Sequence, residues 1–327
     1  MLERIELLYQ ARNIFRESGY ILNEHPYRSA SFDFVARRNR VFIVKVILNL
    51  ESVAGQHAIE LLLIAEMLKA TPIVLGVRSN NSNISDGVIY ERHGVLALNL
   101  HTLRDLLLED QIPTARAKRG GHYINISHTK LRKLRIKKAL SLRDVARTLN
   151  LSVKTIRSYE SGDAIPTAEN ALRLRKLLGD EVIQPIALFK KPEKKSLPRN
   201  KQTPKTELQR NVQEQLVELD VEVVWFDFAP MDAICHTKAS VELESEHKPT
   251  MITGVAHSIC GETMKRMNDA VTIGLITNNK AFFIIQNEMK HKELIPPLPT
   301  LQLDHLEQLN DQEELMQIIR QYRRSYA

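Results

Sequence analysis

The sequence predicts a multidomain protein in which a central all-α domain of five helices lies between two α/β domains. In the first and the last third of the chain, apolar runs typical of buried strands alternate with longer helical segments. The middle of the chain has helical apolar spacing and capping residues instead. The lysine- and proline-rich segment KKPEKKSLPRNKQTPK, at 190–205, is expected to be a flexible linker before the last domain.

The first domain, at 1–112, is expected to open with a charged amphipathic helix in MLERIELLYQARNIF. A second helix is expected at 55–70, and a short third helix from Thr102. The expected extended segments are SFDFVARR at 31–38, RVFIVKVIL at 40–48, PIVLGV at 72–77 and GVIYERHGVLALNL at 87–100.

The second domain, at 113–189, is expected to be helical throughout once PTARAKRGG, at 113–121, has ended. The third domain, at 206–327, is expected to begin with a helix. It continues with MDAICHT at 231–237, the strand TMITGV at 250–255, a helix at about 258–276 and the strand AFFIIQ at 281–286. In both outer domains an aspartate opens a short strand that precedes a buried strand, a long helix and another buried strand. We interpret the third domain as a duplicate of the first, although any two α/β domains share part of this order.

The positive charge of the chain is concentrated in its middle. Between Pro113 and Thr206 there are 23 lysines and arginines against 7 aspartates and glutamates, a net charge of +16. Because the whole chain carries +7, the flanking segments together carry −9. Clustered cations favour contact with a polyanion, since they release counterions from phosphates, although a solvated charged surface without a partner is the alternative.

The segment LSLRDVARTLNLSVKTIRSYESG, at 140–162, predicts two short helices joined by a tight turn. Ser141 and Asp144 fit a capping box, so the first helix is expected to begin near Leu142. Asn150 can adopt the left-handed conformation that ends a helix, and Ser152 can cap the second helix. The residues expected to face inward are Val145, Ala146, Leu149, Ile156 and Tyr159.

The outward face of the second helix is polar and cationic. Lys154, Arg157 and Ser158 share one face because they are spaced by three and four residues, and Thr155 lies beside them. These residue types can reach base edges or phosphates. A helix with a purely structural role would more often expose glutamate as well, whereas Glu160 stands near the helix end. The pattern favours a DNA-contacting helix over a hairpin buried for stability.

The residues from about Leu131 to Leu178 resemble the helix-turn-helix domain of the Cro and phage-repressor class. The matching segments are LRKLRIKKALSL, VARTLNLS, IRSYESG and IPTAENALRLRKLLG. In that class the helix after the turn enters the major groove. Leu142 departs from the class, which often has glutamine there, so Arg143 or Ser141 is expected to contact phosphate instead. The DNA-contacting residues that we predict are Ser141, Arg143, Ser152, Val153, Lys154, Thr155, Arg157 and Ser158.

The resemblance extends along the whole chain to an archaeal family of transcriptional regulators. It is carried by DGVIYERHGVLALNLHTLRDLL at 86–107, RGGHYINI at 119–126 and MITGVAHSI at 251–259. That family has a single Cro-type domain in the middle of a chain of about this length. The resemblance implies a DNA-binding regulator, and it implies no ligand for the flanking domains.

The outer domains resemble the restriction-endonuclease fold, in which an aspartate and an acidic-x-lysine signature hold a divalent metal. Asp33 and Lys45 match two of these positions, but Ile43 stands where the second acid belongs. In the third domain Asp232 is retained, while TMITG offers neither acid nor lysine. We therefore expect a nuclease-like fold without catalysis, with Asp33 and Lys45 as vestigial candidates and Asp33 serving as a hydrogen-bonding residue at a strand end. A metal-dependent nuclease, or its remnant, is the alternative.

No cofactor or metal is expected. Cys235 and Cys260 lack metal-ligand spacing and are interpreted as buried free thiols, and the eleven histidines are dispersed. No apolar run reaches the roughly 20 residues that a membrane-spanning helix needs, and the first residues lack a signal-peptide pattern, so we expect a cytoplasmic protein without membrane contact.

We expect a regulator that binds double-stranded DNA in a sequence-specific manner and is not an enzyme. A transcription bridging factor, whose helix-turn-helix contacts the transcription machinery, is a further alternative. A homodimer is expected because one recognition helix reads too few base pairs for specificity. The acidic flanks are expected to form its interface, while PTARAKRGG and the linker give the central domain freedom to adjust.

Overall fold

The computed structural model describes residues 3–23, 26–27, 31–186, 188, 203–237, 250–287 and 298–321. Most of the predicted linker at 190–205 therefore lies outside the described residues. The chain forms two compact units. Unit 1 comprises residues 1–18, 46–53 and 74–190, and unit 2 comprises residues 19–45, 54–73 and 191–327. Among the described residues, no helix is long and apolar enough to cross a membrane.

Unit 1 combines a sheet with a group of helices. Its strand order is β4-β8-β7-β9-β10, where β4 (Thr71–Leu75) contributes its last two residues. The segment predicted at 87–100 is a hairpin of β7 (Val88–Arg92) and β8 (Val95–Leu98). His93 and Gly94 form its two-residue turn with positive φ, as hairpins of this length require. The remaining elements before the central domain are α1 (Arg4–Glu17), η1 (Leu50–Ser52), β5 (Arg78–Ser79), β6 (Ser82–Asn83) and α3 (Leu100–Leu108).

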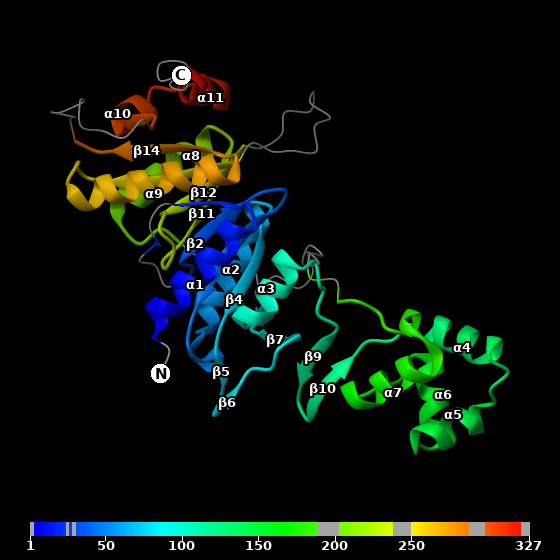
Figure 1. Cartoon of the computed structure of the whole chain (residues 1–327). Helices are drawn as coiled ribbons and strands as arrows, with labels where there is room; N and C mark the ends of the chain where they lie inside the picture. The colour runs from blue at the N-terminus through cyan, green and yellow to red at the C-terminus, as the bar shows by residue number, and fades with distance from the viewer. Residues whose placement is uncertain are drawn as a thin grey trace. The chain divides into compact units, whose positions relative to one another are not determined.

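The expectation of helix throughout after residue 121 is wrong. A hairpin of β9 (Ala115–Lys118) and β10 (Gly121–Ile124) leads into the helices (Figure 1). Gly120 and Gly121 have φ of 95° and 138°, which allows the tight reversal between the strands. Residues 115–118 of PTARAKRGG form β9, which also pairs with β7 in parallel, so the segment is held in the sheet and does not act as a free hinge.

Four α-helices follow the hairpin and lie together in Figure 1. They are α4 (His128–Lys137), α5 (Leu142–Leu149), α6 (Val153–Ser161) and α7 (Ala168–Leu178), and the 3-10 turn η2 (Asp180–Val182) comes after them. All five residues predicted to face inward are buried. They share one core with Val88 of β7, Ala115 of β9 and Ile124 of β10, so the helices pack against the hairpin.

Unit 2 contains an antiparallel set of three strands and a five-stranded sheet. The first set is β1 (Ile21–Leu22), β2 (Phe34–Arg37) and β3 (Val41–Val46), followed in the chain by α2 (Gly55–Met67). The five-stranded sheet has the order β11-β12-β13-β14-β15, and its last three strands are parallel. The strands of this sheet and the helices before, between and after them are, in chain order, α8 (Glu207–Glu218), β11 (Val221–Trp225), β12 (Ala233–Thr237), β13 (Thr250–Ala256), α9 (Gly261–Thr277), β14 (Lys280–Ile285), β15 (Thr300–Gln302), α10 (Leu303–Leu306) and α11 (Gln312–Gln321).

The two α/β segments repeat both element order and strand register. In each, a helix and three strands precede a long helix and a further strand. Phe34 pairs with Val44, and the residue after Asp232, Ala233, pairs with Thr253 in the same way. The main-chain carbonyl of each aspartate also accepts from the N–H six residues earlier, at 2.6 Å for Asp33 and 2.8 Å for Asp232. These aspartates therefore occupy equivalent places.

The two cysteines differ in environment. Cys235 is fully buried, as expected, and burial raises the pKa of its thiol. The expectation for Cys260 is wrong, because this residue is exposed. It is the N-cap residue of α9, where Thr263 contacts the thiol at 3.3 Å and lowers its pKa by hydrogen bonding.

Candidate nucleic-acid interface

The predicted turn chemistry between α5 and α6 is confirmed. Ser141 Oγ accepts from Asp144 N at 3.1 Å, and Asp144 Oδ2 accepts from Ser141 N at 2.8 Å. Hydrogen bonds to the carboxylate from the side chain and the main-chain N–H of Ser141 lower the pKa of Asp144. Asn150 ends α5 with φ 55° and ψ 46°, and Ser152 Oγ accepts from Thr155 N at 3.0 Å to start α6. Short-range hydrogen bonds thus fix the angle at which α6 leaves the turn.

The outer face of α6 is cationic. Lys154 and Arg157 are exposed, and neither forms an ion pair within the part of the chain that the structure describes. Thr155 and Ser158 are half-buried beside them, and the Thr155 hydroxyl lies 2.9 Å from that of Ser152. The other predicted contact residues, Ser141, Arg143, Ser152 and Val153, are exposed. All eight predicted residues lie on α5, α6 or their caps.

An ion pair between α4 and α6 holds the opposite side of the candidate recognition helix. Arg135 donates from Nε and Nη2 to the two carboxylate oxygens of Glu160, at 2.6 and 3.0 Å. Its Nη1 donates to the Leu140 carbonyl at 2.9 Å. The two side chains are only 13% and 9% exposed, and the bond to Glu160 raises the pKa of Arg135. This pair is not predictable from the sequence, because its members lie 25 residues apart and only tertiary packing brings them together.

The vestigial candidates of the first α/β segment lie together. Asp33 is 1% exposed, and Lys45 Nζ lies 3.6 Å from its Oδ1. Ile43 is fully buried and pairs with Val35 of β2, so an alkyl group fills the place of the missing acid. This donor set does not fit a divalent metal, because it supplies a single carboxylate and Ile43 offers no oxygen in place of the second acid. Among the described residues, no group of three or more His, Cys, Asp and Glu side chains could hold a metal ion.

Glu60 of α2 is a buried acid that the sequence analysis did not single out. Its carboxylate accepts from Ser31 Oγ at 2.6 Å and from the main-chain N–H groups of Asp227 and Phe228 at 2.5 and 3.0 Å. The Phe228 ring also packs edge-on against His57, with ring centroids 4.4 Å apart. Glu60 therefore binds the main chain of the loop before β12. A glutamate in the apolar segment AIELLLIAEM gave no sequence signal for this long-range role.

Comparison with known proteins gives two family matches and several relatives that align with nearly the whole chain. Residues 4–113 match the PD-(D/E)XK superfamily domain, and residues 131–181 match the helix-turn-helix family. A protein of Thermococcus gammatolerans, provisionally named an HTH-type transcriptional regulatory protein, is 32% identical over 319 residues, which cover 97% of this chain and 96% of that protein. The chain belongs to this archaeal family.

Relatives with the same kind of name support the assignment to the HTH-type regulatory family. The protein of Pyrococcus abyssi is 31% identical over 97% of this chain and 98% of its own length. That of Methanobrevibacter smithii is 28% identical over 98% of both chains. No solved structure matches the chain. The family resemblance and the nuclease-like fold of the first segment, both predicted from the sequence, are confirmed.

Proposed function

We propose that the protein is a sequence-specific DNA-binding transcriptional regulator that inserts α6 into the major groove. The observation that carries this proposal is the pair of exposed cations, Lys154 and Arg157, on a helix whose other side is fixed by a core and an ion pair. Unpaired Lys and Arg on a helix after a tight turn suit phosphate and base-edge contact. The names of the relatives support the same function.

We propose two α/β domains at 1–112 and 206–327, a DNA-binding domain at 113–189 and a linker at 190–205. The 3-10 turn at Asp180–Val182 would be the fifth helical element of the DNA-binding domain. Selection of bound sequences from a random DNA pool tests the function. Enrichment of one motif supports it, equal retention of all sequences would show non-specific binding, and retention of no DNA speaks for a bridging factor that contacts the transcription machinery.

We further propose that the chain does not cleave DNA. The expected result is intact duplex DNA after incubation with Mg²⁺ or Mn²⁺, because Ile43 replaces the second acid and Glu60 is already bonded to three donors. Gel electrophoresis of plasmid and linear DNA checks this. Cleavage that disappears in Asp33→Ala would instead establish a metal-dependent nuclease.

The protein is also proposed to bind a two-fold symmetric site as a homodimer through surfaces outside 113–206. Two copies of the central segment, each near +16, would repel one another, whereas the flanking segments carry −9 in total. A dimer should protect two half-sites one helical turn apart, or a multiple of that, roughly 34–36 Å centre to centre. Light scattering and footprinting check this. A monomer that protects a single unrepeated half-site would contradict it.

A further inference from the structure

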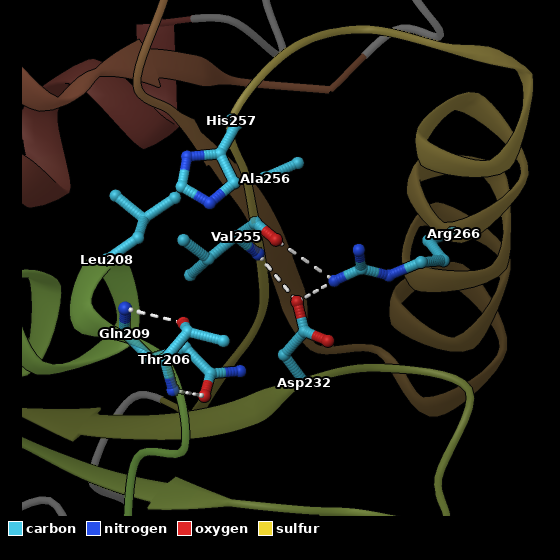
Figure 2. A pocket seen from close by; sticks show the side chains of 8 residues that line it. All are labelled: Thr206, Leu208, Gln209, Asp232, Val255, Ala256, His257 and Arg266. Carbon is cyan, nitrogen blue, oxygen red and sulfur yellow. Dashed lines mark hydrogen bonds and ion pairs between the residues drawn. The ribbon is translucent and has the colours of Figure 1, made fainter.

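A pocket in unit 2 lies where the start of α8, the end of β13 and α9 meet, and its volume is about 270 Å³ (Figure 2). It lies beyond the carboxyl end of β13, a frequent place for ligands in α/β sheets. The size suits a small molecule and is below that of most drug-sized ligand pockets. Its lining residues are Thr206, Leu208, Gln209, Asp232, Val255, Ala256, His257 and Arg266.

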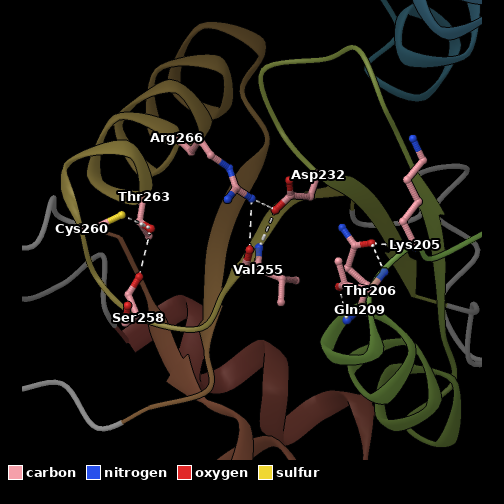
Figure 3. A network of polar contacts seen from close by, with 9 residues as sticks. All are labelled: Lys205, Thr206, Gln209, Asp232, Val255, Ser258, Cys260, Thr263 and Arg266. Carbon is pink, nitrogen blue, oxygen red and sulfur yellow. Dashed lines mark hydrogen bonds and ion pairs between the residues drawn. The ribbon is translucent and has the colours of Figure 1, made fainter.

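The centre of the pocket is an ion pair held by the main chain. Asp232 Oδ2 accepts from Arg266 Nη2 and, at 2.6 Å, from Val255 N. Arg266 Nη2 also donates to the Val255 carbonyl at 3.1 Å, as Figure 3 shows. Its guanidinium carbon lies 5.6 Å from the centre of the Phe283 ring. These contacts fix both charged groups, whose side chains are 18% and 29% exposed.

Each partner of the pair keeps unused hydrogen-bonding capacity. Within the described part of the chain, Arg266 Nε and Nη1 have no acceptor, and Asp232 Oδ1 has no donor. A guanidinium offers five donors and a carboxylate about four acceptor sites, so the pair can still bind a ligand. The ion pair therefore offers a ligand hydrogen-bond donors on Arg266 beside an acceptor on Asp232.

The polar groups around the pair extend the same pattern. Gln209 Oε1 accepts from the N–H groups of Lys205 and Thr206 in the capping box of α8, which leaves its amide N–H groups on the side facing Asp232 in Figure 2. His257 Nδ1 lies 2.5 Å from Gln286 Oε1, so Nε2 is left for a ligand and donates to an anion when the ring carries both protons. The N-terminus of α8 adds a partial positive charge. Together these groups offset the charge of Asp232 and favour an anion.

The equivalent place in the first α/β segment has a different charge arrangement. The register that equates Asp33 with Asp232 equates Lys45 with Gly254, where an added Cβ would overlap the Phe283 ring. Counted from the glycine that begins each helix, Glu60 of α2 corresponds to Arg266 of α9. The cation beside the aspartate thus comes from the strand in the first segment, as Lys45, and from the helix in the second, as Arg266. At the helix position of Arg266 the first segment has the acid Glu60. The second segment is arranged for an anion and not for a metal ion.

We propose that this pocket binds a small molecule that presents an oxyanion to Arg266 and an adjacent hydroxyl or amine donor to Asp232. The free Nε–H and Nη1–H groups of Arg266 can each donate to an oxygen of a phosphate or carboxylate. Asp232 Oδ1 then accepts from the neighbouring donor, which a fully deprotonated oxyanion lacks. Hydrogen phosphate has both features and is the simplest probe.

Calorimetric titration of the full chain with phosphate and with sulfate, in mildly acidic buffer at matched ionic strength, tests the proposal. Phosphate retains an O–H under these conditions and sulfate does not. The expected result is saturable binding with phosphate roughly tenfold or more tighter than sulfate, because sulfate leaves a carboxylate oxygen facing an oxyanion. Equal binding of both ions, or binding of neither, would overturn the proposal.

Substitutions separate the two halves of the site. Asp232→Asn should remove the preference for phosphate, and Arg266→Lys should weaken phosphate binding roughly tenfold by loss of the Nε and Nη1 donors. His257→Ala leaves the ion pair intact and should also weaken binding, whereas the exposed His305→Ala of α10 should not. If Asp232→Asn or Arg266→Lys unfolds the chain, the phosphate affinities of His257→Ala and His305→Ala decide whether the site binds phosphate. Identical affinities in these two variants would refute the site.

Discussion

The double variant Lys154→Ala/Arg157→Ala is expected to bind its selected DNA site about 100-fold or more weakly than the unsubstituted protein. A lost base contact costs about 1–3 kcal/mol, and a lost phosphate contact weakens binding to all sequences alike. Both side chains are exposed and lack an ion-pair partner among the described residues, so their removal leaves no buried group unsatisfied. The fold should therefore be unchanged, and the loss should be confined to DNA binding.

Fluorescence anisotropy with a labelled duplex measures this loss. Arg157→Ala alone and Lys154→Ala alone, assayed at several salt concentrations, separate base contact from phosphate contact, because a phosphate-contacting residue reduces the salt slope by about one. Lys176→Ala on α7 is the matched control for each single variant, since it also removes one positive charge from an exposed position of the same unit. If the double variant binds as tightly as Lys176→Ala, α6 is not the recognition helix.

Arg135→Ala is expected to lower the free energy of unfolding of the helical domain by about 2–3 kcal/mol. The substitution leaves Glu160 as a largely buried carboxylate without its two donors, and loss of one member of such a pair costs more than the pair contributes. The Leu140 carbonyl also loses a donor. Because α4 then no longer holds α6 by this pair, DNA affinity should fall as well.

Urea unfolding combined with hydrogen exchange across α4–α7 measures the effect. Arg175→Ala is the matched control, because its partner Asp180 is 80% exposed and such surface pairs contribute about 0–1 kcal/mol. In a double-mutant cycle, Arg135→Ala/Glu160→Ala should be less destabilised than the sum of the single variants. Additive losses, or a loss in Arg135→Ala no larger than in Arg175→Ala, would show that the pair does not hold α6.

The sequence predicts best the features that depend on neighbouring residues. The capping box of Ser141 and Asp144, the left-handed Asn150 and the cap at Ser152 each involve groups within three or four positions, and local chemistry determines them. The inward face of α5 and α6 follows from helical spacing in the same way. Asp33 and Lys45 were placed together by family resemblance, and the structure has them 3.6 Å apart.

Features that depend on distant residues were not predictable from the sequence. The basic segment before α4 has the composition of a linker, but Gly120 and Gly121 turn it into a hairpin, and pairing with β7 fixes β9 in the sheet. The partner of Glu160 gives no signal in the sequence, because Arg135 lies 25 positions away. Cys260 was expected to be buried on its chemistry alone, whereas its place at the start of α9 exposes it.

Genome-wide mapping of DNA bound in cells, by the unsubstituted protein and by Lys154→Ala/Arg157→Ala, tests the central claim most directly. If α6 reads DNA, the unsubstituted protein should occupy discrete sites that share a two-fold symmetric motif, and the variant should lose these sites at equal abundance. Occupancy that persists in the variant, or that follows transcription complexes without a shared motif, would contradict a DNA-reading regulator.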